Sequence, residues 1–178
     1  MITPPLRIDT ERLTLRKPSM EDAETLFGAY TQDPDVAKYT TWRPHKELPE
    51  TEDYLRRCLR GWETGDGFTY AIVLKDGGEL VGMIDIRPRG FKADTGYVLA
   101  TRHWGQGYAA EALRALIEWA FSQGKIYRVW AVCDVENKAS ARVLEKAGMT
   151  LEGRLRRNMM HPNVSEEPRD TFCYSIVR

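Results

Sequence analysis

The pattern of apolar and polar positions changes its period along the chain, and each period predicts a kind of element. Alternation, or a short apolar run, predicts strands at residues 12–16, 68–74, 80–86, 94–100, 127–133, 149–155 and 171–177. Apolar residues spaced three and four apart predict helices at residues 20–30, 54–62, 109–121 and 139–147. The predicted order is one strand, two helices, three strands, a helix, a strand, a helix and two strands.

The connections between the predicted strands indicate how they pair. Residues 75–79, Lys-Asp-Gly-Gly-Glu, have the composition of a hairpin turn, so the strands beside it are antiparallel. Segments 94–100 and 127–133 are joined by a helix, which makes that pair parallel. We therefore expect an α+β fold, with a central mixed, mostly antiparallel sheet of about six or seven strands and helices on both faces. Nothing divides the chain, so residues 1–178 are expected to form a single domain.

Charge and composition exclude several classes of protein. Lys+Arg and Asp+Glu are 26 each, and this balance disfavours non-specific nucleic-acid binding, which needs a basic face. The N-terminal residues lack the apolar stretch of a signal peptide, and no run has the length of a membrane span. We expect a cytoplasmic protein that binds neither membrane nor nucleic acid directly.

The cysteines and histidines are few and far apart. Cys58, Cys133 and Cys173 form no C-x-x-C pair, and the histidines at 45, 103 and 161 are equally scattered. This spacing favours buried, reduced thiols over a zinc site or a disulfide framework. No metal site is expected.

Residues 97–112 are the stretch around which the rest is organised. An apolar strand runs into a loop with Gly105 and Gly107, and a helix follows directly. Glycine permits a positive φ and lets N–H groups crowd around an anion, and a helix N-terminus adds unpaired donors and a partial positive charge. Strand, loop and helix together predict a phosphate-binding cradle. A plain strand-to-helix turn that needed glycine is the alternative.

A dinucleotide-binding oxidoreductase is one hypothesis for such a loop. Gly105-x-Gly107-x-x-Ala110 follows a strand, and Asp134 ends the next strand near the spacing expected for a ribose-binding carboxylate. Residues 135–178, however, contain only one predicted helix and a hairpin, which leaves no second nucleotide-binding half. The antiparallel hairpin before the loop also disagrees with a parallel sheet.

Several motifs together resemble the GNAT superfamily of N-acetyltransferases over essentially the whole chain. Residues 102–107, Arg-His-Trp-Gly-Gln-Gly, match its pyrophosphate loop, and residues 137–140 and 144–149 resemble its next motif. Residues 11–16, Gly96-Tyr97 followed by 104–112, and Asn137-x-x-Ser140 resemble the RimJ/RimL-type branch, which includes ribosomal-protein N-terminal acetyltransferases.

The resemblance implies acetyl-CoA as cosubstrate and a sheet that splays between its two central parallel strands, with pantetheine in the gap. Backbone groups of Val98 and Ala100 would pair with the pantetheine amides, loop amides would hold the pyrophosphate, and the Arg102 side chain would be free to add charge. The implied cofactor-binding residues are Val98, Leu99, Ala100, Arg102, Trp104, Gly105, Gln106, Gly107, Tyr108, Ala109, Asn137 and Ser140.

The implied chemistry is direct attack of a primary amine on the thioester, which needs an oxyanion donor, a base and a proton for the thiolate. The resemblance makes the Leu99 N–H the oxyanion donor and Asp94 the general base, with Glu136 as second choice; a plain surface aspartate is the alternative for Asp94. Leu144 stands where many members of the family carry a tyrosine that serves as general acid. Ser140 is the implied proton donor, with water or a purely local role for the serine as alternatives.

The acceptor is less defined than the donor. An α-amine of pKa ~7.7–8.0 costs well under ~1 kcal/mol to deprotonate near neutral pH, whereas a lysine of pKa ~10.4 costs about 4 kcal/mol. No histidine or glutamate stands out as a base on the matching strands, which favours an N-terminal amine, for instance of a protein. Tyr39, Trp42 and Arg43, in the irregular segment 36–49, are the candidate acceptor-binding residues, with ordinary surface as the alternative. A silent acetyl-CoA sensor stays open, as does a homodimer.

Overall fold

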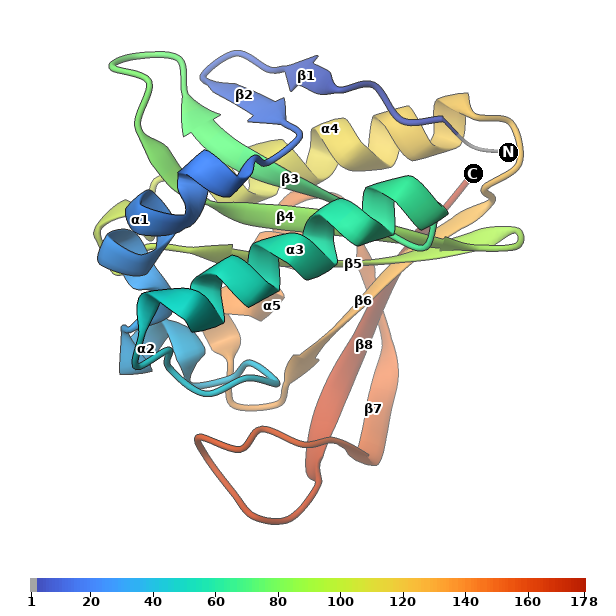
Figure 1. Ribbon diagram of the computed structural model, residues 1–178. Coiled ribbons are helices and arrows are strands. Elements are labelled where there is room, and N and C mark those ends of the chain that lie inside the picture. Colours follow the sequence, from blue (N-terminus) through green and yellow to red (C-terminus); the bar gives the residue numbers. More distant parts are fainter. Residues whose placement is uncertain (1–2) are drawn as a thin grey trace.

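A single eight-stranded sheet forms the centre of the computed structural model, which describes residues 3–178 (Figure 1). The strands follow one another in space as β1-β2-β3-β4-β5-β6-β8-β7. Their bounds are Arg7–Asp9 (β1), Leu13–Arg16 (β2), Phe68–Leu74 (β3), Leu80–Arg89 (β4), Lys92–Leu99 (β5), Arg128–Asp134 (β6), Thr150–Met159 (β7) and Arg169–Val177 (β8). The mixed, mostly antiparallel sheet is confirmed. It has one strand more than predicted, because β1 is too short to show an alternation.

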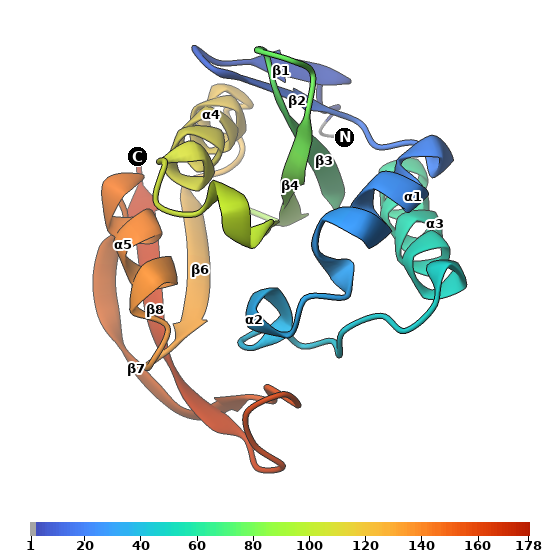
Figure 2. The same ribbon diagram turned by 90° about the vertical axis from the view of Figure 1, so that its left-hand side faces the viewer.

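Helices cover both faces of the sheet, as predicted (Figure 2). The helices are α1 (Ala23–Leu26), α2 (Pro34–Ala37), α3 (Leu48–Thr64), α4 (Tyr108–Ser122) and α5 (Lys138–Lys146). The first predicted helix, 20–30, is divided into a 3₁₀ turn, α1 and a π turn. Helices α1 and α3 lie on one face of the sheet, and α4 and α5 lie on the other (Figures 1 and 2).

The alternation along the strands builds a separate apolar core on each face. Ile84 of β4 packs in the core that contains Leu113 of α4. Met83, its neighbour in the sequence, packs in the other core, with Leu26 of α1 and Leu55 of α3. Because successive side chains point to opposite faces, the same rule places Asp94, Gly96 and Val98 on the α3 face and Tyr97 and Leu99 on the α4 face.

The sheet opens between its two parallel strands. Strands β5 and β6 are paired only at Lys92↔Arg128, Ala93↔Val129 and Asp94↔Trp130. Beyond these pairs both strands continue, β5 to Leu99 and β6 to Asp134, without further pairing. The parallel pair and the splay are therefore confirmed, and the splay leaves the inner edges of both strands without a β-sheet partner.

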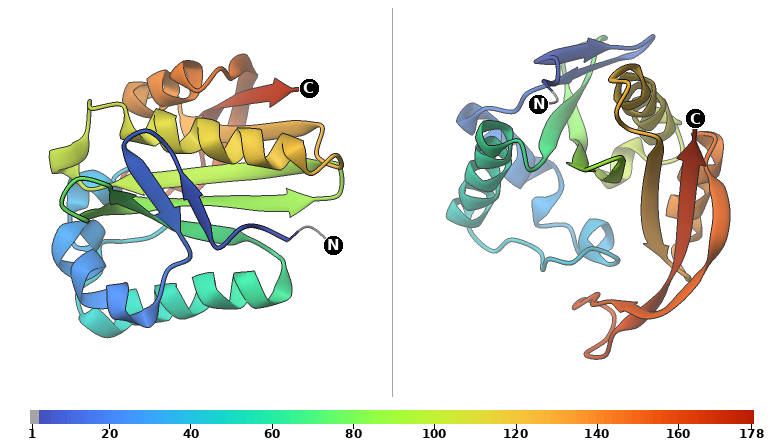
Figure 3. Two further views of the ribbon diagram at one scale, coloured as in Figure 1. Left: turned by 90° about the horizontal axis from the view of Figure 1, so that it is seen from above. Right: turned by 90° about the vertical axis from the view of Figure 1, so that its right-hand side faces the viewer.

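The two halves of the opened sheet are bridged at one end by loops. The Nδ2 of Asn163, in the β7–β8 loop, donates to the carbonyl oxygens of Ala37 and Trp42, at 2.7 Å in each case. Figure 3 shows the β7–β8 hairpin extending past the rest of the sheet. These hydrogen bonds fix the end of that hairpin against the segment between α2 and α3.

Three features of the described residues bear on the chemistry of the chain. No helix within residues 3–178 has the length and apolar character that a membrane span requires. The three cysteines are free thiols, two of them buried. Across the same described residues, no group of three or more His, Cys, Asp or Glu side chains is arranged to hold a metal ion.

Candidate active site

A cleft of about 1220 Å³ occupies the gap between β5 and β6. It is bordered by the start of α4 at one end, by α5 along one wall, and by segment 35–42 and the end of β7 opposite. Binding sites for drug-sized ligands have volumes of about 300–1,000 Å³. The cleft is therefore large enough for a long ligand and a second reactant.

The glycine loop forms the helix end of this cleft. Gly107 has a φ of +85° and is the residue before the first turn of α4, so the unpaired N–H groups of that turn face the cleft. The Nη1 of Arg12 donates to the carbonyl oxygen of Gln106 at 3.0 Å, and its guanidinium lies 4.7 Å from the centre of the Tyr108 ring. A cation from the bend between β1 and β2 thus supports the predicted phosphate cradle.

The side chain of Arg102 differs from the expectation. Its Nη2 donates to Oε1 of Glu79 at 2.6 Å, and its Nε donates to the same oxygen at 3.0 Å. The guanidinium is therefore ion-paired rather than free, because the β3–β4 turn brings a carboxylate beside the loop. The loop's own tryptophan is anchored as well, since Trp104 Nε1 donates to the Leu99 carbonyl at 2.8 Å.

Hydrogen bonds along the end of β5 indicate which backbone groups face the gap. The Ala100 N–H donates to the Val81 carbonyl at 2.9 Å, and the Ala100 carbonyl accepts from His103 N at 2.9 Å. Both backbone groups of Ala100 are thus occupied within the chain. Residues two apart in a strand point to the same edge, so the backbone groups of Val98 also face β4, and the expectation that these two residues pair with pantetheine is wrong. Successive N–H groups of a strand point to opposite edges, so the Leu99 N–H points away from β4 and into the gap.

Helix α5 and strand β5 each contribute a hydroxyl group to the cleft. Asn137 accepts a hydrogen bond from Ser140 N at 3.0 Å and so caps the helix. The hydroxyl oxygens of Ser140 and Tyr97 are 2.8 Å apart. Burial raises the pKa of Tyr97, and burial together with Asp134 raises the pKa of Cys133 to about 11, so these groups keep their protons at neutral pH.

Carboxylates and an arginine form the floor of the cleft on the α3 face. Arg87 Nη2 lies 2.6 Å from Asp94 Oδ2, and its Nη1 lies 3.1 Å from Asp85. Burial raises the pKa of Asp85 to about 6, because Arg87 offsets only part of the lost hydration and Asp94 repels the second charge. Two carboxylates and one guanidinium leave one negative charge, which suits a cationic amine. Asp85 and Arg87 were not predicted as site residues, because polar residues that alternate with apolar ones along β4 are typical of a solvent-exposed strand face.

A buried histidine lies at the far end of the cleft. His161 Nδ1 is 2.9 Å from Asp134 Oδ2, and the side chains of His161 and Asp134 are 2% and 0% exposed. Arg169 Nε also donates to Asp134 Oδ2, at 2.6 Å. The Tyr39 ring meets the imidazole edge-on with centroids 6.3 Å apart. The sequence pattern does not reveal this pair, because His161 and Asp134 are on different elements.

The same contacts exclude the dinucleotide hypothesis. Asp134 is buried and hydrogen-bonded to His161 and Arg169, so it is not available to a ribose. Only β5 and β6 form a parallel pair in the eight-stranded sheet. A doubly wound parallel sheet is therefore absent from residues 3–178.

Most of the predicted site residues border the cleft. Those that line it are Tyr39, Trp42, Asp94, Val98, Leu99, Trp104, Gly105, Gly107, Tyr108, Ala109, Asn137 and Ser140. Arg43, Ala100, Arg102 and Gln106 are outside this lining. The opened sheet and the glycine loop thus define a site for a long, extended, anionic ligand, the class of site that binds CoA thioesters in the family that the sequence resembles.

Comparisons with known proteins agree with this class. A family model described as an acetyltransferase (GNAT) domain matches residues 12–150. The uncharacterized N-acetyltransferase p20 of Bacillus licheniformis is 34% identical over 152 residues, which are 83% of this chain and 84% of the relative. The ribosomal-protein-serine acetyltransferase of Escherichia coli (strain K12) is 30% identical over 133 residues, which are 68% and 73% of the two chains.

Solved structures share the whole architecture. A GNAT-family acetyltransferase from Bacillus anthracis has a TM-score of 0.84 and 30% identity, covering 96% of this chain and 98% of its own. The microcin C7 self-immunity acetyltransferase MccE, in complex with acetyl-CoA and AMP, has a TM-score of 0.87 at 24% identity, covering 99% and 98%. The chain belongs to the GNAT acetyltransferase family, and its relatives indicate the RimJ/RimL-like branch.

Proposed function

We propose that this protein transfers the acetyl group of acetyl-CoA to a primary amine by direct attack within a ternary complex. The observation that carries the proposal is the cleft between β5 and β6, which has a phosphate cradle at one end and an acidic floor on the α3 face. Acetyl-CoA would extend from the Gly105–Gly107 loop into the gap, and the amine would approach from the side of Tyr39 and Trp42.

The groups needed for acyl transfer are proposed from this geometry. The Leu99 N–H, aimed into the gap, would stabilise the developing oxyanion. Ser140, hydrogen-bonded to Tyr97, would give the departing thiolate its proton, and Tyr97 would take the place of the family's tyrosine, which is Leu144 here. Asn137 and the loop amides would hold the cofactor, and the backbone of Leu99, not that of Val98, would face the pantetheine.

We propose an α-amine as the acceptor, such as the N-terminus of a peptide or protein. Its ammonium form would be drawn to the floor formed by Asp85, Arg87 and Asp94, where Asp94 would take its first proton. An α-amine of pKa ~7.7–8.0 makes this step inexpensive. The E. coli relative, by its name, acetylates a ribosomal-protein serine, which supports an α-amine without identifying the acceptor of this chain.

Acetylation of matched peptides tests this proposal. The full chain would be incubated with acetyl-CoA and a serine-initiated peptide, with release of the CoA thiol and peptide mass measured together. We expect one acetyl group on the peptide for each CoA released. The control is the same peptide already acetylated at its N-terminus, with an internal lysine retained, which should show no gain in mass.

The alternatives give different outcomes. A silent acetyl-CoA sensor would transfer the acetyl group to no amine. Acetyl-CoA at 100 times its dissociation constant would still raise the free energy of unfolding by about 2.7 kcal/mol, and the melting temperature with it. Acetylation of the blocked peptide at its lysine would contradict the α-amine and keep the acetyltransferase.

Two further properties are proposed, one from an edge strand of the sheet and one from the cysteines. We propose a homodimer paired through β7, the edge strand that exposes Leu151 and Leu155, because an unpaired edge with apolar residues suits a second copy. Light scattering of the full chain should give twice the mass of the chain, and Leu155→Lys should give the monomer.

We also propose a cytoplasmic location, because the three cysteines are free thiols.

A further inference from the structure

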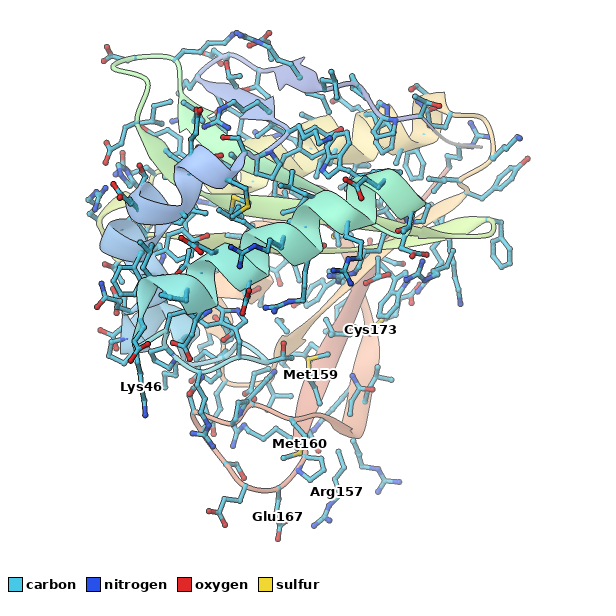
Figure 4. The ribbon with its side chains drawn as sticks, viewed as in Figure 1. Lys46, Arg157, Met159, Met160, Glu167 and Cys173 are labelled. Carbon is cyan, nitrogen blue, oxygen red and sulfur yellow. The ribbon has the colours of Figure 1, made fainter. Side chains whose placement is uncertain are left out.

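The imidazole of His161 is held in one orientation inside the cleft. Its Nδ1 is paired with Asp134, and that carboxylate is fixed by Arg169 Nε and Nη2 at 2.6 and 3.1 Å and by the Glu136 N–H at 2.9 Å. Figure 4 shows Met159 and Met160, the residues before His161, where β7 gives way to its terminal loop. An imidazole fixed by packing and by a buried carboxylate is preorganised for one task.

The hydrogen bonds determine which nitrogen carries the proton. Burial would raise the pKa of Asp134, but the bonds from Arg169, Glu136 N and His161 outweigh it and hold that pKa at about 2. The carboxylate is therefore ionised at neutral pH and accepts only, so His161 Nδ1 donates. The neutral imidazole then has its lone pair on Nε2, which has no hydrogen-bond partner among the described residues.

The surroundings of the imidazole come from several elements. Asp134 of β6 and Arg169 of β8 face it from the buried side, and Glu136 pairs with Arg169 beside them. Tyr39 covers its edge, and the Lys38 ammonium lies 5.2 Å from the centre of the Tyr39 ring. The remaining side of the imidazole faces the cleft, which Tyr39 and Trp42, the proposed acceptor-binding residues, also line.

We infer that His161, positioned by Asp134, is a general base of the transfer, with Nε2 accepting the proton that the amine nitrogen loses as it attacks. The inference rests on the proposed function. The nitrogen forms a bond to the acetyl carbon, the carbon–sulfur bond breaks, and the N–H proton goes to Nε2 and then to solvent. The thiolate takes its proton from Ser140 or water, so charge and atoms balance. Asp94 acts earlier, on the ammonium.

A purely structural role would explain less. The β7–β8 loop is already fastened by Asn163, through two hydrogen bonds that do not involve the histidine. Any polar residue could fill a structural position, but a carboxylate that sets the tautomer and leaves Nε2 toward the cleft is the arrangement that orients a histidine base in enzymes. No histidine base lies on the strands that the family motif matches, because His161 is in the loop of the final hairpin.

The test is the pH dependence of acetyl transfer by the full chain. In the wild type, kcat at saturating amine should fall on the acid side, because a protonated base cannot accept the proton of the amine. His161→Asn should lower kcat about 10²-fold or more and remove that acid limb. Asp134→Asn, which changes the tautomer while keeping the imidazole, should lower kcat and alter the same limb. Acetyl-CoA should still raise the melting temperature of both variants.

Asn163→Ala is the matched control, because it loosens the loop without touching the imidazole. It should lower the melting temperature and retain the acid limb. His161→Asn with wild-type kcat, or with the limb unchanged, overturns the inference, as does Asn163→Ala reproducing its pH profile. If the wild type itself acetylates no amine, the proposed function fails and the inference with it. If the wild type acetylates the amine and His161→Asn has the same kcat and pH profile, the inference fails alone.

Discussion

The hydroxyl oxygens of Tyr97 on β5 and Ser140 on α5 lie 2.8 Å apart across the opening of the sheet. Tyr97 also donates to the Ser140 carbonyl oxygen at 3.1 Å, so the tyrosine is fixed against the first turn of the helix. Strand β5 thus places a tyrosine beside Ser140. On helix α5, Leu144 occupies the position where the family commonly has a tyrosine.

Removing either hydroxyl should slow the chemical step. We expect Tyr97→Phe and Ser140→Ala each to lower kcat about 10²-fold, since the thiolate would then depend on water for its proton. The KM for acetyl-CoA should change little, because the proton is transferred only in the transition state. Steady-state release of CoA measures both constants. Tyr127→Phe, at an exposed tyrosine outside the cleft, is the control, and a kcat within twofold of wild type for Ser140→Ala would contradict the role.

The floor of the cleft should make acceptor binding depend on pH. Asp85 has a raised pKa of about 6, so it is neutral below that pH and charged above it. The attraction for the acceptor's ammonium is therefore lost as pH falls through about 6, and the KM for the amine should rise there. Asp85→Asn should raise that KM about tenfold at neutral pH, equivalent to ~1.4 kcal/mol. It should also flatten the dependence; a KM profile identical to wild type would rule the role out.

Glu111 of α4 should be a main support of the N-terminal strands. Its Oε1 accepts from the Thr10 hydroxyl at 2.6 Å and the Arg12 N–H at 2.8 Å, and its Oε2 accepts from Arg12 Nε at 2.7 Å. Glu111→Ala leaves these donors without partners and should cost about 2–3 kcal/mol, or roughly 4–12 °C in melting temperature. Asp53→Ala, which breaks an exposed ion pair with Arg56 on α3, should change it by little. Equal effects of the two substitutions would refute the assignment.

The glycine loop can be tested separately from overall stability. Gly107 has a left-handed backbone, and an added Cβ would lie 3.4 Å from Arg12 Nη2. Gly77, in the β3–β4 turn, has a similar φ of +75° with open space around it. Alanine at either position should cost about 1–2 kcal/mol of stability. Only Gly107→Ala should also raise the Kd for acetyl-CoA, by about tenfold, in titration calorimetry. An unchanged Kd would mean that the loop is only a turn.

The parts of the fold that the sequence predicted depend on local patterns. Alternation places β3 to β6, a helix between segments 94–100 and 127–133 makes that pair parallel, and glycine at 105 and 107 before an apolar helix indicates the phosphate loop. Where a pattern is too short, prediction fails: Arg7–Asp9 forms a strand only because Leu13–Arg16 pairs with it.

The sequence by itself determined the order of the elements, the parallel pair, the glycine loop and the family, because each depends on neighbours close along the chain. Tertiary structure alone decided which polar groups in and beside the cleft are paired with one another. The Arg102–Glu79 ion pair, the carboxylates gathered around Arg87, and His161 bound to Asp134 and Arg169 join residues from different elements. Whether a charge is free, paired or buried depends on what the fold brings against it, and periodicity carries no record of that.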